Sequence, residues 1–243
     1  MAICVKKIFI CLLFLAISSV LSAKNSFSVI NADGEDIAFR EILIEKSMQG
    51  EVFNCTVTMD NLQSALQKLA EKKCDIITFK GKLPNSVKLP ENIEYKHFAS
   101  TPIIIAVHNS NPLTKLKISE LRKIWNDDCN NWGYFNPKNF FSIHRFGMPL
   151  NDGNFIYLRN FLQLKENSQH FPLDSSQQIL TMVSANPNAI GIAVMSENLN
   201  LKGVKLIQLT DENNRNIPFV IPHNIMFRKN DKSKIDNFIK IKK

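Results

Sequence analysis

Apolar and polar positions change period along the chain in a regular order. Residues 26–32 alternate with the two-residue period of a strand, and residues 37–48 follow the spacing of a helix with Ile37, Ile42 and Ile44 available to a core. Three more elements continue the alternation: a strand at 52–58, a helix at 62–73 and a short buried strand at 74–79. Strands that alternate with helices at this spacing predict an α/β fold built on a mostly parallel sheet.

The middle of the chain contains a long amphipathic segment, residues 108–132. Leu121, Ile124 and Trp125 occupy positions i, i+3 and i+4 and share one face of a predicted helix, for which Ser119 is a reasonable N-cap. We expect Trp125 and Trp132 to lie in the core. The other predicted elements are two strands within 95–107, strands at 140–146, 204–209 and 221–227, and helices at 154–165, 175–184 and 232–241.

The N-terminal residues have the pattern of a secretory leader. Lys6 and Lys7 form a basic region, residues 8–17 an apolar run, and residues 18–23 a stretch of small side chains. The apolar run is shorter than the roughly 18 residues that a membrane-spanning helix needs. We therefore expect a signal peptide at 1–23, cleaved near Ala23, and a periplasmic or secreted protein; an uncleaved anchor is the alternative.

The composition is that of a folded globular protein, with 44% apolar and 21% charged residues. The formal net charge is +8, and it falls to +6 when the two lysines of the leader are removed. A basic surface suits nucleic acid, an anionic envelope surface or an anionic ligand. Nucleic acid is not expected, because the lysines are spread along the chain and export separates the protein from it.

Residue patterns for catalysis and metal binding are absent from the sequence. The five histidines show no paired ligand spacing, and no nucleophile elbow or phosphate-cradling glycine-rich loop occurs. Cys55, Cys74 and Cys129 follow the leader without a CxxC pair or a cysteine–histidine ligand spacing. The sequence therefore predicts neither an enzyme nor a metal or cofactor site.

Three segments, in the order in which they follow one another along the chain, give the clearest indication of function. The first comprises Asn111-Pro112, Leu116, Glu120-Leu121, Ile124-Trp125 and Asn131-Trp132. The second is residues 64–83, SALQKLAEKKCDIITFKGKL, and the third comprises Pro187, Ala189-Ile190-Gly191 and Ala193. Together they resemble the phosphate-type periplasmic substrate-binding proteins of ABC transporters, although Lys117 and Asn188 depart from that pattern.

The resemblance implies a two-lobed type II periplasmic binding protein fold, with a mostly parallel sheet flanked by helices in each lobe and two hinge strands. Lobe 1 is expected at 24–106 and again at 193–243, and lobe 2 at 107–192. In that fold an intervening strand separates the strands of Cys55 and Cys74. Two strand spacings of about 4.8 Å exceed the reach of a disulfide, about 7 Å between Cα atoms, so buried thiols are expected.

Three loops of the family bind the ligand, and the resemblance transfers them to this chain. The turn after the first strand gives Asp33 and Gly34, and the loop after the 74–79 strand gives Thr78 and Lys80. The third loop, 145–154, matches a family pattern that begins with arginine and continues to Ser-Gly-Thr. It supplies Arg145, Asp152, Gly153 and Asn154, in which Asp152 and Asn154 replace the serine and the threonine.

The replacement of hydroxyls by a carboxylate leaves several interpretations open. An ionised Asp152 accepts hydrogen bonds and repels a dianion, although a carboxylate can also accept a proton from a protonated oxyanion. Asp152 is alternatively a helix N-cap, Arg145 a salt-bridged framework residue, and Asp33-Gly34 a simple turn. Arg145 and Lys80 keep the site suitable for an anion.

These observations predict an exported, monomeric solute-binding protein that holds a small anion, phosphate or a similar oxyanion, in an interlobe cleft and delivers it to an ABC permease in the inner membrane. The alternative is a binding-fold protein that has lost transport and acts as an envelope sensor or a protein-interaction module.

Overall fold

The computed structural model describes residues 26–239 except Asp33, Asn139, Asn167 and Glu197. The expected signal peptide therefore lies outside the described residues. The described chain forms two compact units: residues 26–79, 84–96 and 224–239 make up the first, and residues 80–83 and 97–223 the second. Among the described residues, no helix is long and apolar enough to cross a membrane.

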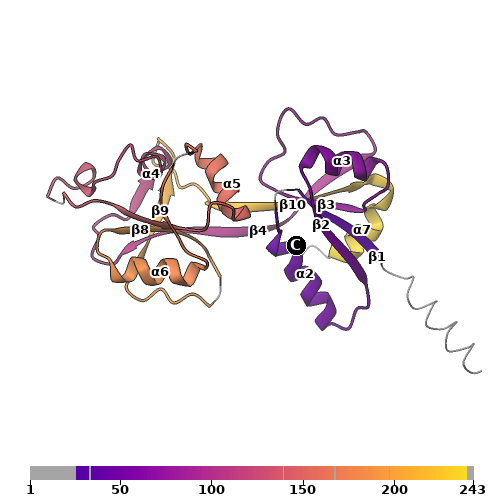
Figure 1. The fold of residues 1–243 in the computed structure, drawn as a ribbon, viewed down its shortest axis with the longest axis horizontal. Helices are drawn as coiled ribbons and strands as arrows, with labels where there is room; N and C mark the ends of the chain where they lie inside the picture. The colour runs from indigo at the N-terminus through magenta and orange to yellow at the C-terminus, as the bar shows by residue number, and fades with distance from the viewer. Residues whose placement is uncertain (1–25, 33, 139, 167, 197, 240–243) are drawn as a thin grey trace, which may run out of the picture. The chain divides into compact units, whose positions relative to one another are not determined.

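Parallel strands form the centre of the first unit (Figure 1). Strand β1 (Ser26–Asn31) lies between β2 (Asn54–Met59) and β3 (Ile76–Lys80) and is parallel to both. The elements that complete this unit are α2 (Ile37–Met48), α3 (Leu62–Ala70), the short helix η2 (Lys229–Asp231) and α7 (Lys232–Ile239). The predicted alternation of strands and helices is confirmed for this part of the chain.

Helix α2 begins and ends at the predicted residues but buries a different face. Ile37 and Ile44, expected in the core, are exposed, whereas Phe39 and Lys46 are buried. The reason is the aromatic ring of Phe238 in α7, which lies 6.5 Å from the Phe39 ring between centroids and 5.5 Å from the Lys46 ammonium. Lys46 tolerates burial because its Nζ also donates to Glu51 at 2.9 Å.

The second unit combines antiparallel and parallel strand pairs. Strand β4 (Ile93–His108), whose residues belong to both units, pairs antiparallel with β8 (Ala189–Val194) and β9 (Val204–Thr210). Strand β6 (His144–Gly147) is parallel to β8 and to the short β7 (Phe171–Pro172). The other elements of the unit are β5 (Lys115–Lys117), α4 (Ile118–Trp125), η1 (Trp132–Tyr134), α5 (Gly153–Leu162) and α6 (Ser176–Ala185).

The units divide the chain at other points than those expected from the sequence. The expected boundaries were 106/107 and 192/193, whereas the structure divides near 96/97 and 223/224. The strand predicted at 204–209 for the first lobe is β9, which pairs with β4 and β5 in the second unit. Strand β10 (Val220–Arg228) is the segment that returns the chain to the first unit.

Helix α4 presents the predicted face to the core. Leu121, Ile124 and Trp125 are fully buried, and Trp132 is also buried, as expected. The N-cap, however, is Lys117 and not Ser119. The Glu120 carboxylate accepts a hydrogen bond from the Lys117 backbone N–H at 2.8 Å, the reciprocal half of a capping box, which fixes the helix start two residues earlier.

Three described cysteines are free thiols, and their environments differ. Cys74 and Cys129 are buried, as expected, whereas Cys55 is only half-buried because it lies on β2. Burial raises the pKa of the Cys74 thiol to about 11. These thiols are therefore protonated near neutral pH and poorly reactive.

Candidate functional site

The carboxyl ends of β1 and β3 bring two buried polar side chains together in the first unit. Asn31 ends β1, and the Thr78 hydroxyl donates to the Asn31 side-chain oxygen at 2.7 Å. The Ala32 N–H also donates to the Thr78 carbonyl at 2.9 Å. Thr78, a predicted ligand residue, thus donates its hydroxyl hydrogen bond to another residue of the protein.

The turn from β1 into α2 contains Gly34 and the capping residue Asp36. Gly34 has a φ of 79°, a left-handed conformation that suits glycine, and Asp33 lies outside the described residues. The Asp36 carboxylate, 2% exposed, accepts from the Phe39 N–H at 3.1 Å. A carboxylate therefore occupies the N-terminus of α2, where the helix dipole favours negative charge.

A second aspartate caps α5 in the second unit. The Asp152 carboxylate accepts from the Asn154 N–H at 2.7 Å and from the Phe155 N–H at 3.1 Å. Gly153 is the first residue of the helix, and Asn154 is buried. Asp152 is thus an N-cap, as one of the two interpretations expected.

Arg145 is held inside the second unit by two acceptors. Its Nη1 donates to the Ile124 carbonyl at 2.8 Å and forms an ion pair with Asp127 at 2.5 Å, and the side chain is 12% exposed. These contacts join β6 to the C-terminal end of α4. The structure therefore gives Arg145 the framework role that was weighed against ligand binding; a ligand contact stays a prediction.

The loop after β3 lies against α5 within the second unit. Gly81 has a φ of 79°, its N–H donates to the Pro222 carbonyl at 2.8 Å, and a Cβ there would lie 2.6 Å from the Tyr157 ring. Tyr157 is one helical turn beyond Gly153, and its hydroxyl donates to the Val220 carbonyl at 3.5 Å. Lys80, the residue before Gly81, is buried. The chain that follows the predicted Thr78–Lys80 loop therefore packs on the helix that follows the predicted 145–154 loop.

His170 braces the turn that leads into α5, a role the sequence analysis missed. Its Nε2 donates to the Met148 carbonyl at 2.7 Å, and its ring lies 4.6 Å from that of Phe155. Burial, with a smaller contribution from the Arg145 charge, lowers the pKa of His170 below its usual value. No local signal reveals this contact, because His170 and Met148 are distant in the sequence.

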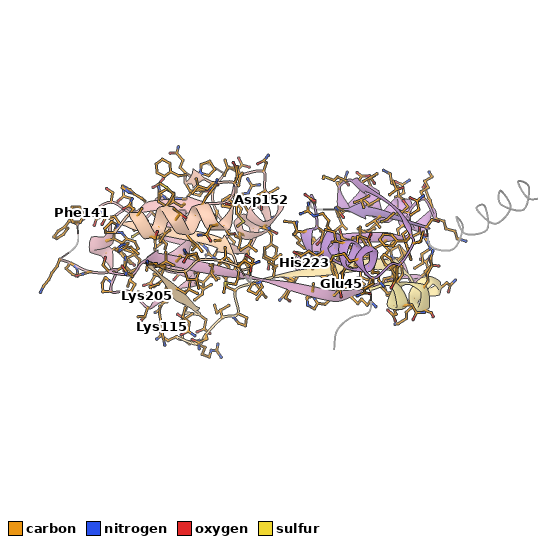
Figure 2. The ribbon with its side chains drawn as sticks, turned by 90° about the horizontal axis from the view of Figure 1, so that it is seen from below. Glu45, Lys115, Phe141, Asp152, Lys205 and His223 are labelled. Atoms are coloured by element: carbon orange, nitrogen blue, oxygen red, sulfur yellow. The ribbon has the colours of Figure 1, made fainter. Side chains whose placement is uncertain are left out.

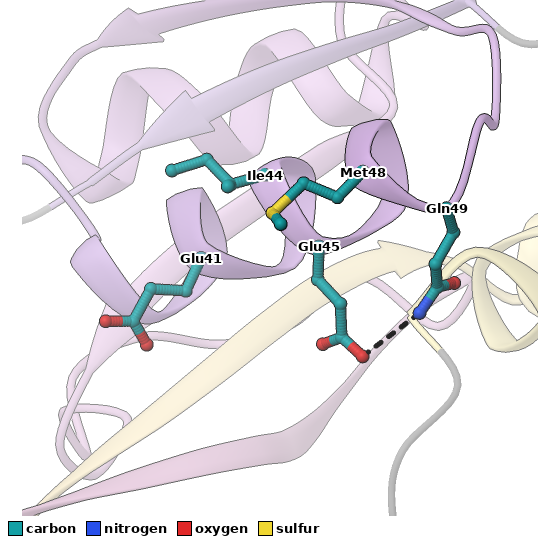
Figure 3. A pocket seen from close by; sticks show the side chains of 5 residues that line it. All are labelled: Glu41, Ile44, Glu45, Met48 and Gln49. Carbon is teal, nitrogen blue, oxygen red and sulfur yellow. Dashed lines mark hydrogen bonds between the residues drawn. The ribbon is translucent and has the colours of Figure 1, made fainter. Parts of the chain in front are cut away.

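A surface hollow of ≈ 470 Å³ lies on the outer side of α2 and contains none of the predicted ligand residues (Figure 3). Its lining side chains are Glu41, Ile44, Glu45, Met48 and Gln49, and the Gln49 amide donates to Glu45 at 3.2 Å. Two carboxylates repel an anion, so this hollow does not suit the predicted ligand. No group of three or more potential metal-ligating side chains occurs among the described residues.

Comparisons with known proteins place the fold. Residues 14–235 match the model of the PBP superfamily domain. An ABC-type phosphate transport receptor from Vibrio cholerae has a TM-score of 0.69 at 17% identity, over 89% of this chain and 94% of the receptor. A possible phosphate binding protein from Planctomyces limnophilus has a TM-score of 0.69 at 16% identity, over 89% of this chain and 87% of that protein. PstS from Borrelia burgdorferi has a TM-score of 0.64 at 15% identity, over 90% of this chain and 92% of PstS.

A curated relative has a different description. A probable RuBisCO transcriptional regulator from Thalassiosira pseudonana is 26% identical over 158 residues, which is 64% of this chain. The chain spans about half the length of that relative, 48%. The match to the family model covers most of the sequence, and the predicted two-lobed α/β fold is confirmed. The chain belongs to the PBP superfamily and has the fold of the phosphate-type periplasmic binding proteins.

Proposed function

We propose that this chain is an exported solute-binding protein that captures a small oxyanion, phosphate or a close relative, for an ABC-type importer. The ligand would be bound and then released to a permease in the inner membrane. Its mechanism is sequestration by closure around the ligand, with no bond made or broken. The protein would act as a monomer in the periplasm.

The packing of the Lys80–Gly81 loop on α5 carries this proposal. Lys80 is buried, and the next residue, Gly81, packs on Tyr157 in the first turns of a helix, where backbone N–H groups and the helix dipole attract negative charge. A lysine ammonium supplies a full positive charge and donors only. The arrangement supports an anion, and it lies at a carboxyl end of strands, where α/β folds bind ligands.

Asp152 limits which anion fits this place. Its carboxylate already accepts two backbone N–H groups of α5 and adds a negative charge next to the proposed ligand. A carboxylate accepts but does not donate, so it would favour an oxyanion that keeps a proton to give. Protonated phosphate meets this requirement, whereas a fully deprotonated oxyanion such as sulfate does not.

A second candidate is a transport-inactive member of the fold that acts as an envelope sensor or a protein-interaction module. Aspartates cap both α2 and α5, and Arg145 is committed to Asp127 and to the Ile124 carbonyl. Each of these contacts occupies a group that could otherwise serve an anion. These observations favour a protein that has kept the fold but no longer binds a ligand.

Calorimetric titration of the chain without residues 1–23 separates the candidates. Phosphate at low salt and near neutral pH comes first, followed by sulfate and a panel of small anions. Micromolar binding of phosphate that is lost in Lys80→Gln but kept in Lys82→Gln would support the importer. Lys82 is the matched control, because it is an exposed lysine in the same loop. No heat with any anion would favour the second candidate.

A further inference from the structure

Three aromatic side chains project into solvent from one loop of the second unit, residues 134–141, here named the aromatic loop. Phe140 is 74% exposed, Phe141 66% and Tyr134 57%. Figure 2 shows Phe141 and Asp152 at opposite ends of this unit, so the aromatic loop is remote from the α5 turn. The proposed anion site does not account for these side chains.

Backbone contacts at the base of the loop hold these rings outward. The Trp132 N–H donates to the Phe141 carbonyl at 3.0 Å, and the Asn131 amide donates to the Phe140 carbonyl at 2.6 Å. Trp132 is itself anchored in the core, where its Nε1 donates to the Asn188 carbonyl at 2.9 Å. The sequence pattern predicts a strand over 140–146, but the strand begins only at His144, which leaves both phenylalanines in the loop.

The stretch of chain that contains the aromatic loop carries charge of one sign. From Cys129 to Asn151 the chain contains Lys138 and Arg145 and no aspartate or glutamate. Lys123 of α4 adds a further cation: its Nζ donates to the Tyr134 hydroxyl at 3.2 Å and lies 5.3 Å from the centre of that ring.

The nearest acidic residues along the chain are already paired. Asp127 forms its ion pair with Arg145, and Asp128 pairs with Lys165 at 2.6 Å. Lys138 therefore lies in a stretch, 129–151, that has no carboxylate side chain, whereas Lys123 also interacts with Glu120 of α4.

We propose that the aromatic loop binds the surface of an anionic lipid bilayer, with Phe140 and Phe141 entering the interface and Lys123 and Lys138 lying over acidic headgroups. Aromatic rings are favoured at the headgroup level, and lysines are drawn to a negative lipid surface. A bilayer fits better than a protein partner, because the basic stretch 129–151, which has no aspartate or glutamate, complements a surface that is negative throughout. This inference goes beyond the proposed function and does not depend on it.

The outer face of α2 supplies the matched control. Ile44 and Met48 are also exposed and apolar, at 52% and 84%, but Glu41 and Glu45 lie beside them. An anionic bilayer repels that face. Binding through general hydrophobicity would use both surfaces, whereas the proposal predicts that only the aromatic loop is used.

Cosedimentation with vesicles tests the proposal, using vesicles of equal parts phosphatidylglycerol and phosphatidylcholine and vesicles of phosphatidylcholine alone. The double variant Phe140→Ser with Phe141→Ser should bind the anionic vesicles about tenfold or more weakly than the parent chain. Lys138→Gln should weaken binding about fivefold. The control variant Ile44→Ser with Met48→Ser should bind like the parent. All proteins carry the same N-terminus, so its contribution cancels in the comparison.

Phe140→Trp gives a second readout that preserves the aromatic character of the loop. Its emission should shift to shorter wavelength with anionic vesicles and stay unchanged with phosphatidylcholine vesicles. The proposal is overturned if the parent chain does not bind anionic vesicles, or if the loop double variant binds as well as the parent. It is equally overturned if binding is lost in the α2 control.

Discussion

The turns from β1 into α2 and from β6 into α5 both end in an aspartate N-cap, but the two aspartates differ in solvent exposure. Each joins a strand of a largely parallel region to a helix, and each places an aspartate at the N-cap. Asp36 is 2% exposed, whereas Asp152 is half-buried at the end of a longer loop that His170 braces. The same sequence signal therefore gives a structural cap in one unit and an accessible carboxylate in the other.

The contact between Gly81 and Tyr157 should dominate the stability of the α5 side. Gly81→Ala forces an alanine into a left-handed φ and against the Tyr157 ring, so we expect a loss of about 2–3 kcal/mol, measured by urea denaturation. Gly50→Ala is the control, because Gly50 has nearly the same φ, 78°, but nothing within 4 Å of an added Cβ. It should lose only about 1 kcal/mol. Equal losses in the two variants would mean that the Tyr157 ring moves away from the added Cβ without cost.

Removal of each aspartate cap should destabilise the protein by different amounts at the two turns. Asp36→Ala should cost about 1–2 kcal/mol, because it leaves buried helix N–H groups unsatisfied. Asp152→Ala should cost no more than about 1 kcal/mol, because water can replace the half-buried carboxylate. Thermal denaturation of both variants measures the difference. If Asp152→Ala were the more costly, the comparison of burial would fail.

Exchange of the accessible cap for a hydroxyl tests its effect on a ligand. Asp152→Ser retains a good N-cap and removes a negative charge, so stability should stay within about 0.5 kcal/mol of the parent. The preference for phosphate over sulfate in calorimetric titration should fall about fivefold, because a serine hydroxyl can donate to an oxyanion that carries no proton. Asp36→Ser, with its charge removed at a buried position, should change this preference less. An unchanged preference in Asp152→Ser would indicate that the carboxylate does not accept a proton from the ligand.

The α5 turn should also respond to pH through His170. Its pKa in the folded protein is below the ordinary value of 6.5, so the unfolded chain binds more protons between these two values. Stability should therefore fall as the pH falls through this window and stay constant above it. His170→Gln, whose amide can still donate to the Met148 carbonyl, should show a smaller fall in melting temperature on mild acidification. An identical fall in both proteins would assign it to other groups.

Local periodicity predicted most elements, because the signals lie within a few residues of one another. The bounds of α2 and the buried face of α4 followed from spacing alone. The burial of Lys46 did not, because Phe238, which covers it, is almost two hundred residues away. The place of β9 was missed for the same reason: its hydrophobic pattern gives a strand but does not name its partners.

The candidate site was predicted in its segments but not in its contacts. The sequence allowed both roles for Asp152, and only the hydrogen bonds to Asn154 and Phe155 identify the cap. The framework role of Arg145 depends on its hydrogen bond to a backbone carbonyl of α4. Every residue has such a carbonyl, so the sequence does not indicate which one Arg145 contacts. The aromatic loop was hidden because two phenylalanines before a strand look like the beginning of that strand.

Strand β2 has a consequence for the protein in concentrated solution. It stands at the end of the sheet order beside β1, and its six residues, Asn54–Met59, carry no charge. Val57 and Met59 are exposed on it. An uncharged open edge is a template on which another extended chain can add, so we expect this edge to favour aggregation at high protein concentration. The counterweight is its formal net charge of +8, because copies of like charge repel before their edges can meet.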